Sequence, residues 1–219
     1  MGNQINLLSS LPKSKRNLSN RTVKKSLEII KISKQYGKMY FDGPREYGYG
    51  GYKYDGRWVS VARDIIKYYG LKKKDRVLDI GCAKGFLVND LMNVLPGLEV
   101  FGLDISDYAI KNSHPEVIGR IHKGSADHLP FSNNSFDLVI SLDTIHNLTK
   151  NRVIVALQEI QRVTKKNSFI RVDSYRNEKE KKIFEDWVLT AEFHDYPNGW
   201  LEIFKQAGYK GDYYWTIIN

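Results

Sequence analysis

The stretch that decides the fold is Arg76-Val77-Leu78-Asp79-Ile80-Gly81-Cys82-Ala83-Lys84-Gly85-Phe86-Leu87. Residues 76–80 are a short apolar run typical of a buried parallel strand, and leucines at four-residue spacing over residues 87–95 predict a helix behind it. Glycines at 81 and 85 lie in the turn between them, where the missing Cβ atoms let the backbone approach a ligand. The stretch therefore predicts a strand, a ligand-binding turn and a helix.

A second apolar run, residues 100–103, ends in Asp104. An acid at the tip of the neighbouring strand is placed to hydrogen-bond the two hydroxyls of a ribose. The dinucleotide fingerprint would need a third glycine where Leu87 stands, and Ala83 replaces its middle glycine, which approaches a pyrophosphate. The two runs together therefore predict a nucleoside site without a pyrophosphate.

The first stretch resembles the first motif of class I S-adenosylmethionine-dependent methyltransferases, which often reads Val-Leu-Asp-Ile-Gly-Cys-Gly-x-Gly. Two later segments extend the resemblance: residues 124–131, Gly-Ser-Ala-Asp-His-Leu-Pro-Phe, and residues 135–141, Ser-Phe-Asp-Leu-Val-Ile-Ser. The three segments follow the family's order over residues 75–150. The resemblance implies S-adenosylmethionine as the cofactor and methyl transfer as the reaction.

The resemblance also implies which residues hold the cofactor. Asp104 would bind the ribose, and Asp127 would meet the adenine amino group, unless Asp127 instead makes an Asx-type turn before Pro130. Ile105 and Leu142 would enclose the adenine ring by apolar contact. The residues expected to bind the cofactor are Asp79, Gly81, Cys82, Ala83, Gly85, Asp104, Ile105, Ser125, Ala126, Asp127 and Leu142.

Strand and helix patterns alternate along the chain, which favours a mostly parallel sheet with helices on both faces. We expect strands at residues 76–80, 99–104, 119–124, 136–142, 168–174 and 211–218. We expect helices at residues 22–35, 59–69, 86–95, 107–112, 151–164, 178–190 and 198–207. The fold class is thus α/β, a Rossmann-like class I methyltransferase fold with six or seven strands. The family's seventh strand is antiparallel; here it is either missing or supplied by residues 189–194.

Charge is distributed unevenly over the 219 residues, whose formal net charge is +9. Residues 1–40 hold nine Lys or Arg and one acid, which places +8 of that charge there. Such an arm either binds nucleic acid, anionic lipid or phosphorylated substrates, or is simply solvated. We divide the chain into a basic arm and lid, residues 1–58, and an S-adenosylmethionine-binding domain, residues 59–219.

The remaining composition narrows the class of protein. No apolar run reaches the length of a membrane span, and no secretory signal or metal-ligand spacing of His and Cys is recognisable. The single cysteine, Cys82, fits a small packed residue better than a nucleophile. We expect a cytoplasmic protein without a metal, and both a monomer and a homodimer are compatible with the sequence.

Tyrosine and glycine dominate residues 36–58, where six glycines argue against a regular helix or strand. We interpret the segment as a lid, because aromatic faces attract cations and the donor is a sulfonium. A surface Ω-loop that only covers apolar area is the alternative. Lys84, in the turn nearby, would either point outward or pair with an acid. The residues assigned to the lid and acceptor are Tyr49, Tyr52, Tyr54, Arg57, Trp58 and Tyr175.

Candidate catalytic residues should follow the carboxyl ends of the strands, where such sheets bind ligands. An acceptor must be aligned with the S–CH3 bond, and a hydroxyl acceptor usually also needs a base. His146 is the first candidate, because an imidazole exchanges protons near neutral pH; its alternative role is packing. Asp143 either positions a substrate hydroxyl or caps the next helix, and His194 is a weaker candidate in a polar segment.

We therefore expect methyl transfer to an oxygen or nitrogen of a small molecule. The whole pattern resembles methyltransferases of cell-envelope polysaccharide and natural-product pathways, which implies a sugar or nucleotide-sugar, and a polar, aromatic site suits carbohydrate. The alternative is an RNA or protein methyltransferase that uses the basic arm. Against it, the strand at 136–142 leads into Ser-Leu-Asp-Thr rather than an Asn-Pro-Pro-Tyr-type motif. A third hypothesis, a binding protein that has lost turnover, is disfavoured by the intact Asp79, Gly81, Gly85 and Asp104.

Overall fold

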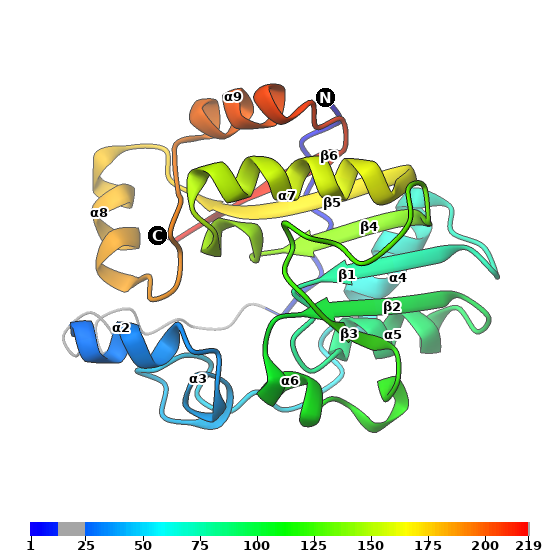
Figure 1. The fold of residues 1–219 in the computed structure, drawn as a ribbon, viewed down its shortest axis with the longest axis horizontal. Coiled ribbons are helices and arrows are strands. Elements are labelled where there is room, and N and C mark those ends of the chain that lie inside the picture. The colour runs from blue at the N-terminus through cyan, green and yellow to red at the C-terminus, as the bar shows by residue number, and fades with distance from the viewer. Residues whose placement is uncertain (13–24, 219) are drawn as a thin grey trace.

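A single parallel sheet organises the computed structural model, which describes residues 1–12 and 25–218 (Figure 1). The strand order is β3-β2-β1-β4-β5-β6, and every pairing between these strands is parallel. Because the order reverses between β1 and β4, their carboxyl ends border a crevice suited to a ligand. The strands are β1 (Arg76–Ile80), β2 (Glu99–Asp104), β3 (Ile121–Lys123), β4 (Phe136–Leu142), β5 (Thr164–Ser174) and β6 (Asp212–Ile217).

Helices cover both faces of the sheet, and others lie beyond its carboxyl edge (Figure 1). On one face lie α4 (Val59–Tyr69) and α5 (Phe86–Val94), and on the other lie α7 (Lys150–Val163) and α9 (Pro197–Ala207). Beyond the carboxyl edge lie α2 (Leu27–Ser33), α3 (Lys38–Asp42), α6 (Asp107–Lys111) and α8 (Glu178–Trp187). Two short 3-10 helices complete the list for the described residues: Pro115–Val117, which contacts α5, and Ile145–Asn147, which follows β4.

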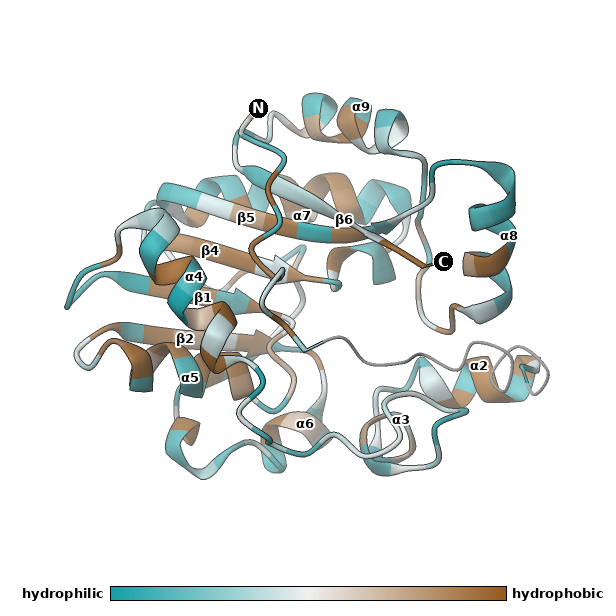
Figure 2. Cartoon of the chain, turned by 180° about the vertical axis from the view of Figure 1, so that it is seen from behind, coloured by the Kyte–Doolittle hydropathy of each residue, from teal (hydrophilic) through white to brown (hydrophobic). Residues whose placement is uncertain are grey.

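Apolar side chains on the two faces form the core, and Figure 2 shows that β4 is largely apolar whereas β5 alternates between apolar and polar stretches. On α7, Val153, Leu157 and Ile160 form an apolar stripe that is fully buried against the sheet. On the opposite face, Val61 and Ile65 of α4 are equally buried. The sheet is therefore packed on both sides, as expected for parallel strands.

The predicted α/β fold is confirmed, and β1, β2, β4 and α4 have the predicted bounds. β5 begins four residues earlier than predicted, at Thr164, because α7 runs into it without a loop. α8 ends early, at Trp187, since Val188 already has extended backbone. α3 was not predicted, and residues 22–24 of the expected first helix lie outside the described residues.

The antiparallel seventh strand is absent from residues 1–12 and 25–218, and residues 189–194 form no strand. The outer edge of β6 is instead bordered by the N-terminal segment. The amide of Ile5 donates to the Tyr213 carbonyl and the amide of Tyr213 donates to the Asn3 carbonyl, both at 3.0 Å, in parallel orientation. The N-terminal segment thus partly covers an edge that would otherwise expose unpaired backbone groups.

No helix in the described part of the chain is both long and apolar enough to cross a bilayer. The N-terminal segment begins with residues that pack on the core. Leu7 and Leu8 are 4% and 6% exposed and belong to the core cluster that includes Val61 and Leu91. The first residues therefore belong to the packed body of the molecule.

We expect Leu7→Ala and Leu8→Ala each to lower the free energy of unfolding by about 2 kcal/mol or more, since each leaves a cavity in a buried cluster. Denaturant titration followed by circular dichroism measures this. Leu27→Ala is the matched control, because Leu27 is 86% exposed. Equal unfolding midpoints for all three variants would show that the N-terminal segment does not pack on the sheet.

Candidate functional site

The turn after β1 is held in a conformation that few residues other than glycine adopt. Gly81 has φ +79°, and a Cβ there would lie 2.0 Å from the Thr144 hydroxyl oxygen. Gly85 has φ +74° and begins α5, and Ala83 between them also has a positive φ of +51°. The turn can therefore pass close to the end of β4 only because position 81 lacks a side chain.

The same turn is fastened to the acid that ends β2. The Ala83 amide donates to Asp104 Oδ2 at 2.7 Å, and the Ser106 amide donates to Asp104 Oδ1 at 2.8 Å. Burial raises the pKa of Asp104, although these backbone donors partly offset the effect. Burial, together with the charge of Asp104, also raises the pKa of Asp79 to about 7. Two neighbouring buried carboxylates favour a cation beside them.

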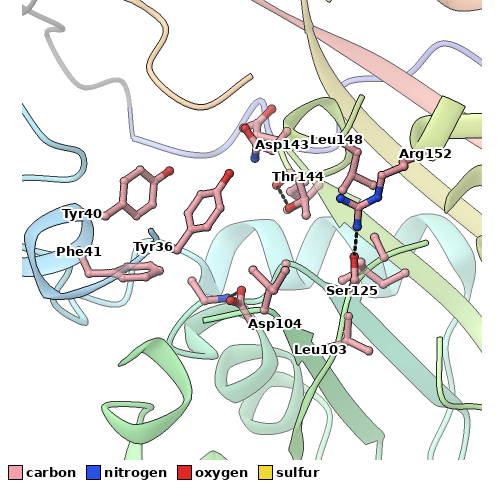
Figure 3. A pocket seen from close by; sticks show the side chains of 18 of the residues that line it. Tyr36, Tyr40, Phe41, Leu103, Asp104, Ser125, Asp143, Thr144, Leu148 and Arg152 are labelled. Carbon is pink, nitrogen blue, oxygen red and sulfur yellow. Dashed lines mark hydrogen bonds between the residues drawn. The ribbon is translucent and has the colours of Figure 1, made fainter. Parts of the chain in front are cut away.

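The carboxyl ends of β1, β2 and β4 border a cavity of about 880 Å³ counted to its open mouth, which we call the first cavity (Figure 3). Seven of the residues expected to bind the cofactor line it: Gly81, Ala83, Asp104, Ile105, Ser125, Ala126 and Leu142.

The other four expected cofactor residues do not line the first cavity. Asp79 is buried at the end of β1. Cys82 packs against the backbone at Gly102, and burial raises the pKa of its thiol, which agrees with a packed residue. Gly85 caps α5, and Asp127 is bound by Arg152.

Sequence reasoning missed several lining residues of the first cavity. Three come from α3 and the turn before it, and the others follow β4 or lie on α7. The segment 36–58 had been identified as a lid, but its first tyrosines were not singled out. Asn147 was not singled out either, although its Oδ1 is buried without a hydrogen-bond partner among the described residues. The missed residues include Tyr36, Tyr40, Phe41, Thr144, Asn147, Leu148 and Arg152.

Among the residues assigned to the lid, Tyr49 lines the first cavity, and its ring centroid is 5.3 Å from that of Tyr40. Tyr52 stacks on Phe86 at 4.8 Å, outside the lining. The others have different partners: Tyr54 donates to Asp90, Arg57 pairs with Asp55, Trp58 packs on the core, and Tyr175 contacts His194.

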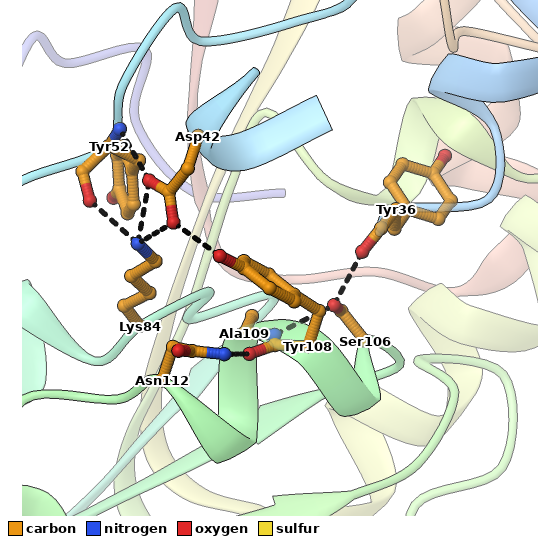
Figure 4. Close-up of polar contacts among 8 residues, drawn as sticks. All are labelled: Tyr36, Asp42, Tyr52, Lys84, Ser106, Tyr108, Ala109 and Asn112. Carbon is orange, nitrogen blue, oxygen red and sulfur yellow. Dashed lines mark hydrogen bonds and ion pairs between the residues drawn. The ribbon is translucent and has the colours of Figure 1, made fainter. Parts of the chain in front are cut away.

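A partly buried ion pair connects the lid to the first turn (Figure 4). Lys84 Nζ donates to both carboxylate oxygens of Asp42 at 2.8 and 2.7 Å and to the Tyr52 carbonyl at 3.0 Å. Tyr108 of α6 donates to the same carboxylate at 2.7 Å. Although burial alone would raise the pKa of Asp42, the bonds from Lys84 and Tyr108 hold it below its ordinary value. Of the two roles expected for Lys84, pointing outward or pairing with an acid, the second is the one observed.

A second cavity of about 760 Å³, again counted to its mouth, adjoins the first and shares Tyr40, Tyr49 and Asp143 with it. His146 also lines it, whereas His194 lines neither cavity. The remaining lining residues are Arg45, Gly48, Asp173, Trp187, Val188, Leu189, Thr190 and Thr216.

Asp143 stands where the two cavities meet, with an uncommon positive φ of +52°. Arg171 binds its carboxylate through two nitrogens, and the Thr216 hydroxyl donates to Oδ1 at 2.8 Å. Burial alone would raise the pKa of Asp143, but the Arg171 guanidinium lowers it, so the carboxylate stays ionised. Strained backbone of this kind concentrates at functional sites.

His146 is buried beside β5. Its Nδ1 accepts the Asp173 amide hydrogen at 3.2 Å, so in the neutral ring the proton lies on Nε2, 3.5 Å from Asp173 Oδ2. The lone pair of this neutral ring lies on Nδ1 and already accepts the Asp173 amide hydrogen. The role of His146 as a base stays a prediction. His194 instead contacts the Tyr175 hydroxyl at 3.1 Å, and burial lowers its pKa.

These residues fit S-adenosylmethionine. The approach allowed by Gly81, the carboxylate of Asp104 and the buried oxygen of Asn147 suit a nucleoside with polar groups. The rings of Tyr40 and Tyr49 face the same space, where a sulfonium would be attracted to them.

We expect the affinity for S-adenosylmethionine to rise as pH rises toward 7 and then level off. A cationic ligand favours ionised Asp79, whose pKa of about 7 in the free protein leaves it protonated at lower pH. Binding below pH 7 must therefore release a proton, and affinity should fall by up to ~10-fold per pH unit. Calorimetry at pH 5.5–7.5 in two buffers measures both effects. Asp79→Asn should abolish the slope; a flat wild-type profile would refute this account.

We expect Lys84→Met to weaken S-adenosylhomocysteine binding about 10-fold, because it leaves the Asp42 carboxylate unpaired under the lid. Lys84→Arg should restore most of the affinity. Lys123→Met is the matched control, since its ion pair with Asp107 is exposed. Wild-type affinity in Lys84→Met, measured by calorimetry, would contradict a role for this pair in holding the cavity wall.

Comparison with known proteins agrees with this geometry. Residues 78–172 match the family described as "Methyltransferase domain". Mouse "Arginine-hydroxylase NDUFAF5, mitochondrial" is 32% identical over 125 residues, covering 49% of this chain and 36% of that protein. "Uncharacterized methyltransferase C1B3.06c" of Schizosaccharomyces pombe is 30% identical over 118 residues, covering 48% and 41%. The chain thus spans less than half the length of these two relatives.

A solved structure described as a SAM dependent methyltransferase from Aquifex aeolicus superposes with a TM-score of 0.51 over 89% of each chain. At 18% sequence identity, this likeness concerns the fold. The matched residues include the end of β1, the glycine turn and the acid that ends β2. Residues 78–172 thus match a methyltransferase domain in sequence, and the chain as a whole has the fold of a SAM dependent methyltransferase.

Proposed function

We propose that the chain transfers a methyl group from S-adenosylmethionine to an oxygen or nitrogen of a small polar molecule held in the second cavity. One observation carries the proposal: the two cavities meet at Tyr40, Tyr49 and Asp143. Methyl transfer needs the acceptor atom in line with the S–CH3 bond, which adjoining cavities can provide. S-adenosylmethionine, when bound, supplies the activated methyl group.

On the donor side, the protein contributes position and charge. Asp104 would hold the ribose, while its amide contacts with Ala83 and Ser106 keep the carboxylate fixed. The carboxylates of Asp79 and Asp104 favour the cationic donor over a neutral nucleoside. The tyrosine rings of the lid shield the reacting atoms from water.

On the acceptor side, the charged residues that line the second cavity are Arg45, Asp143 and Asp173. Carboxylate oxygens accept hydrogen bonds, so they suit a molecule that presents hydroxyl or amine groups. Aromatic rings from Tyr40, Tyr49 and Trp187 add faces against which a sugar could pack. We therefore favour a sugar or amino sugar, and a nucleotide-sugar would need further cations for its diphosphate.

Methylation of a macromolecule is the second candidate, because the charge of the N-terminal arm favours it. Five of the basic residues that give the arm its charge fall outside the described residues: Lys13, Lys15, Arg16, Arg21 and Lys24. One relative is named a hydroxylase, so methyl transfer itself has to be measured rather than assumed.

We expect purified protein to transfer radiolabelled methyl from S-adenosylmethionine to members of a panel of sugars, amino sugars and amines. Asp143→Asn should lower kcat about 100-fold while donor affinity stays within about twofold, because Asp143 would align the acceptor. Asp107→Asn is the control, since Asp107 is 79% exposed in its side chain. No labelled small molecule, with donor binding intact, would contradict the proposal.

The arm is tested in the same assay by replacing its five basic residues between positions 13 and 24 with serine. Substitution is preferable to truncation, because residues 2–8 are bonded to β6 or buried in the core. Small-molecule turnover should be unchanged. Labelling of added RNA that disappears in the variant and falls steeply with salt would establish the macromolecular alternative.

A further inference from the structure

The end of the first cavity opposite the lid is closed by an arginine that neither spacing nor resemblance singled out. Arg152 lies in the first turn of α7 and lines the cavity together with Ser125 and Ala126 (Figure 3). Asp127, the acid expected to meet an adenine amino group, does not line the cavity. The guanidinium thus stands where a carboxylate was expected.

The Asp127 carboxylate forms an ion pair with Arg152. Arg152 Nε donates to Asp127 Oδ2 at 2.6 Å, and Nη2 donates to Asp127 Oδ1 at 3.0 Å. The Ser125 hydroxyl also donates to Oδ1, and it accepts from Nη2 at 3.2 Å. The Asp127 side chain is 15% exposed, whereas that of Arg152 is 50% exposed. Within the described residues, Nη1 of Arg152 makes no hydrogen bond, so its two donors are available.

The path of a bound nucleoside leads to this pair. A ribose held by Asp104 at the end of β2 would direct its base between Ile105 and Leu142, which line the cavity. The next polar groups beyond these apolar contacts belong to Ser125, which follows β3, and to Arg152. The outer edge of the base would therefore face a hydroxyl and a guanidinium.

We propose that Arg152, supported by Ser125, reads the edge of the base in place of an acid, an inference that rests on the proposed function. A guanidinium only donates hydrogen bonds, so it recognises acceptor atoms such as adenine N1. A carboxylate only accepts, so it selects the exocyclic amino group and opposes a carbonyl in its place. The site consequently tolerates a 6-oxo base, and Arg152 determines this specificity.

The experiment compares S-adenosylhomocysteine with S-inosylhomocysteine, which carries a carbonyl in place of the amino group. In calorimetry, the wild-type dissociation constants should agree within about threefold, because a donor can meet either base. In Arg152→Ala the freed Asp127 carboxylate faces the cavity, so the inosyl ligand should bind at least ~10-fold more weakly than the adenosyl ligand. Arg152→Gln provides a second variant should the alanine variant unfold.

Two controls isolate the cause. The quantity compared is the dissociation constant of the inosyl ligand divided by that of the adenosyl ligand. Adding Asp127→Asn to Arg152→Ala should return this ratio toward the wild-type value, because an amide can both donate and accept hydrogen bonds. Lys150 is an exposed basic residue in the same helical turn, and Lys150→Ala should leave the ratio of the two dissociation constants unchanged. A wild-type ratio of ~10 or more, or a low ratio that Arg152→Ala does not raise, would overturn the inference. Failure of the wild type to bind either ligand would instead refute the proposed function.

Discussion

The site depends on one steric constraint: the chain leaving β1 must pass the Thr144 side chain with no side chain of its own. At Gly81 a Cβ would overlap the Thr144 hydroxyl. Because this space is kept clear, the turn continues to Ala83, whose amide reaches the carboxylate of Asp104. The ends of β1, β2 and β4 are thereby held in contact, and the first cavity is the space that they leave between them.

Electrostatics give the two cavities different characters. Asp79 and Asp104 resist ionisation in the free protein, so they are prepared for a cationic ligand. Asp143 is held ionised by Arg171, so it remains a hydrogen-bond acceptor whether or not a cation is present. The one lysine in the glycine turn does not oppose the donor, because Asp42 neutralises it. A single edge of the sheet thus combines carboxylates suited to a cationic donor with one suited to a hydrogen-bonding acceptor.

Sequence patterns predicted the buried strands best, because β1, β2 and β4 are apolar runs whose ends are marked by charged or turn residues. They did not predict α3, since a five-residue helix between two glycines has no usable periodicity. Arg152 could not be found either, because it is an ordinary basic residue in the first turn of an amphipathic helix. Its relation to Asp127 appears only when α7 packs on the sheet. The second cavity likewise needs residues from the segment after α8, which no local spacing connects to β4.

The N-terminal segment beside β6 has a consequence for the order of folding. Asn3 bonds to Asp212, 209 positions away, so this edge closes nearly the whole chain into one loop. Contacts between residues so far apart in the sequence cost a large loop-closure entropy before they add any stabilisation. We therefore expect the sheet to assemble outward from β1 and β4 and the border at β6 to form last. Detachment of the N-terminal segment from β6 would expose Leu7 and Leu8 together. We therefore expect unfolding to begin with residues 1–12.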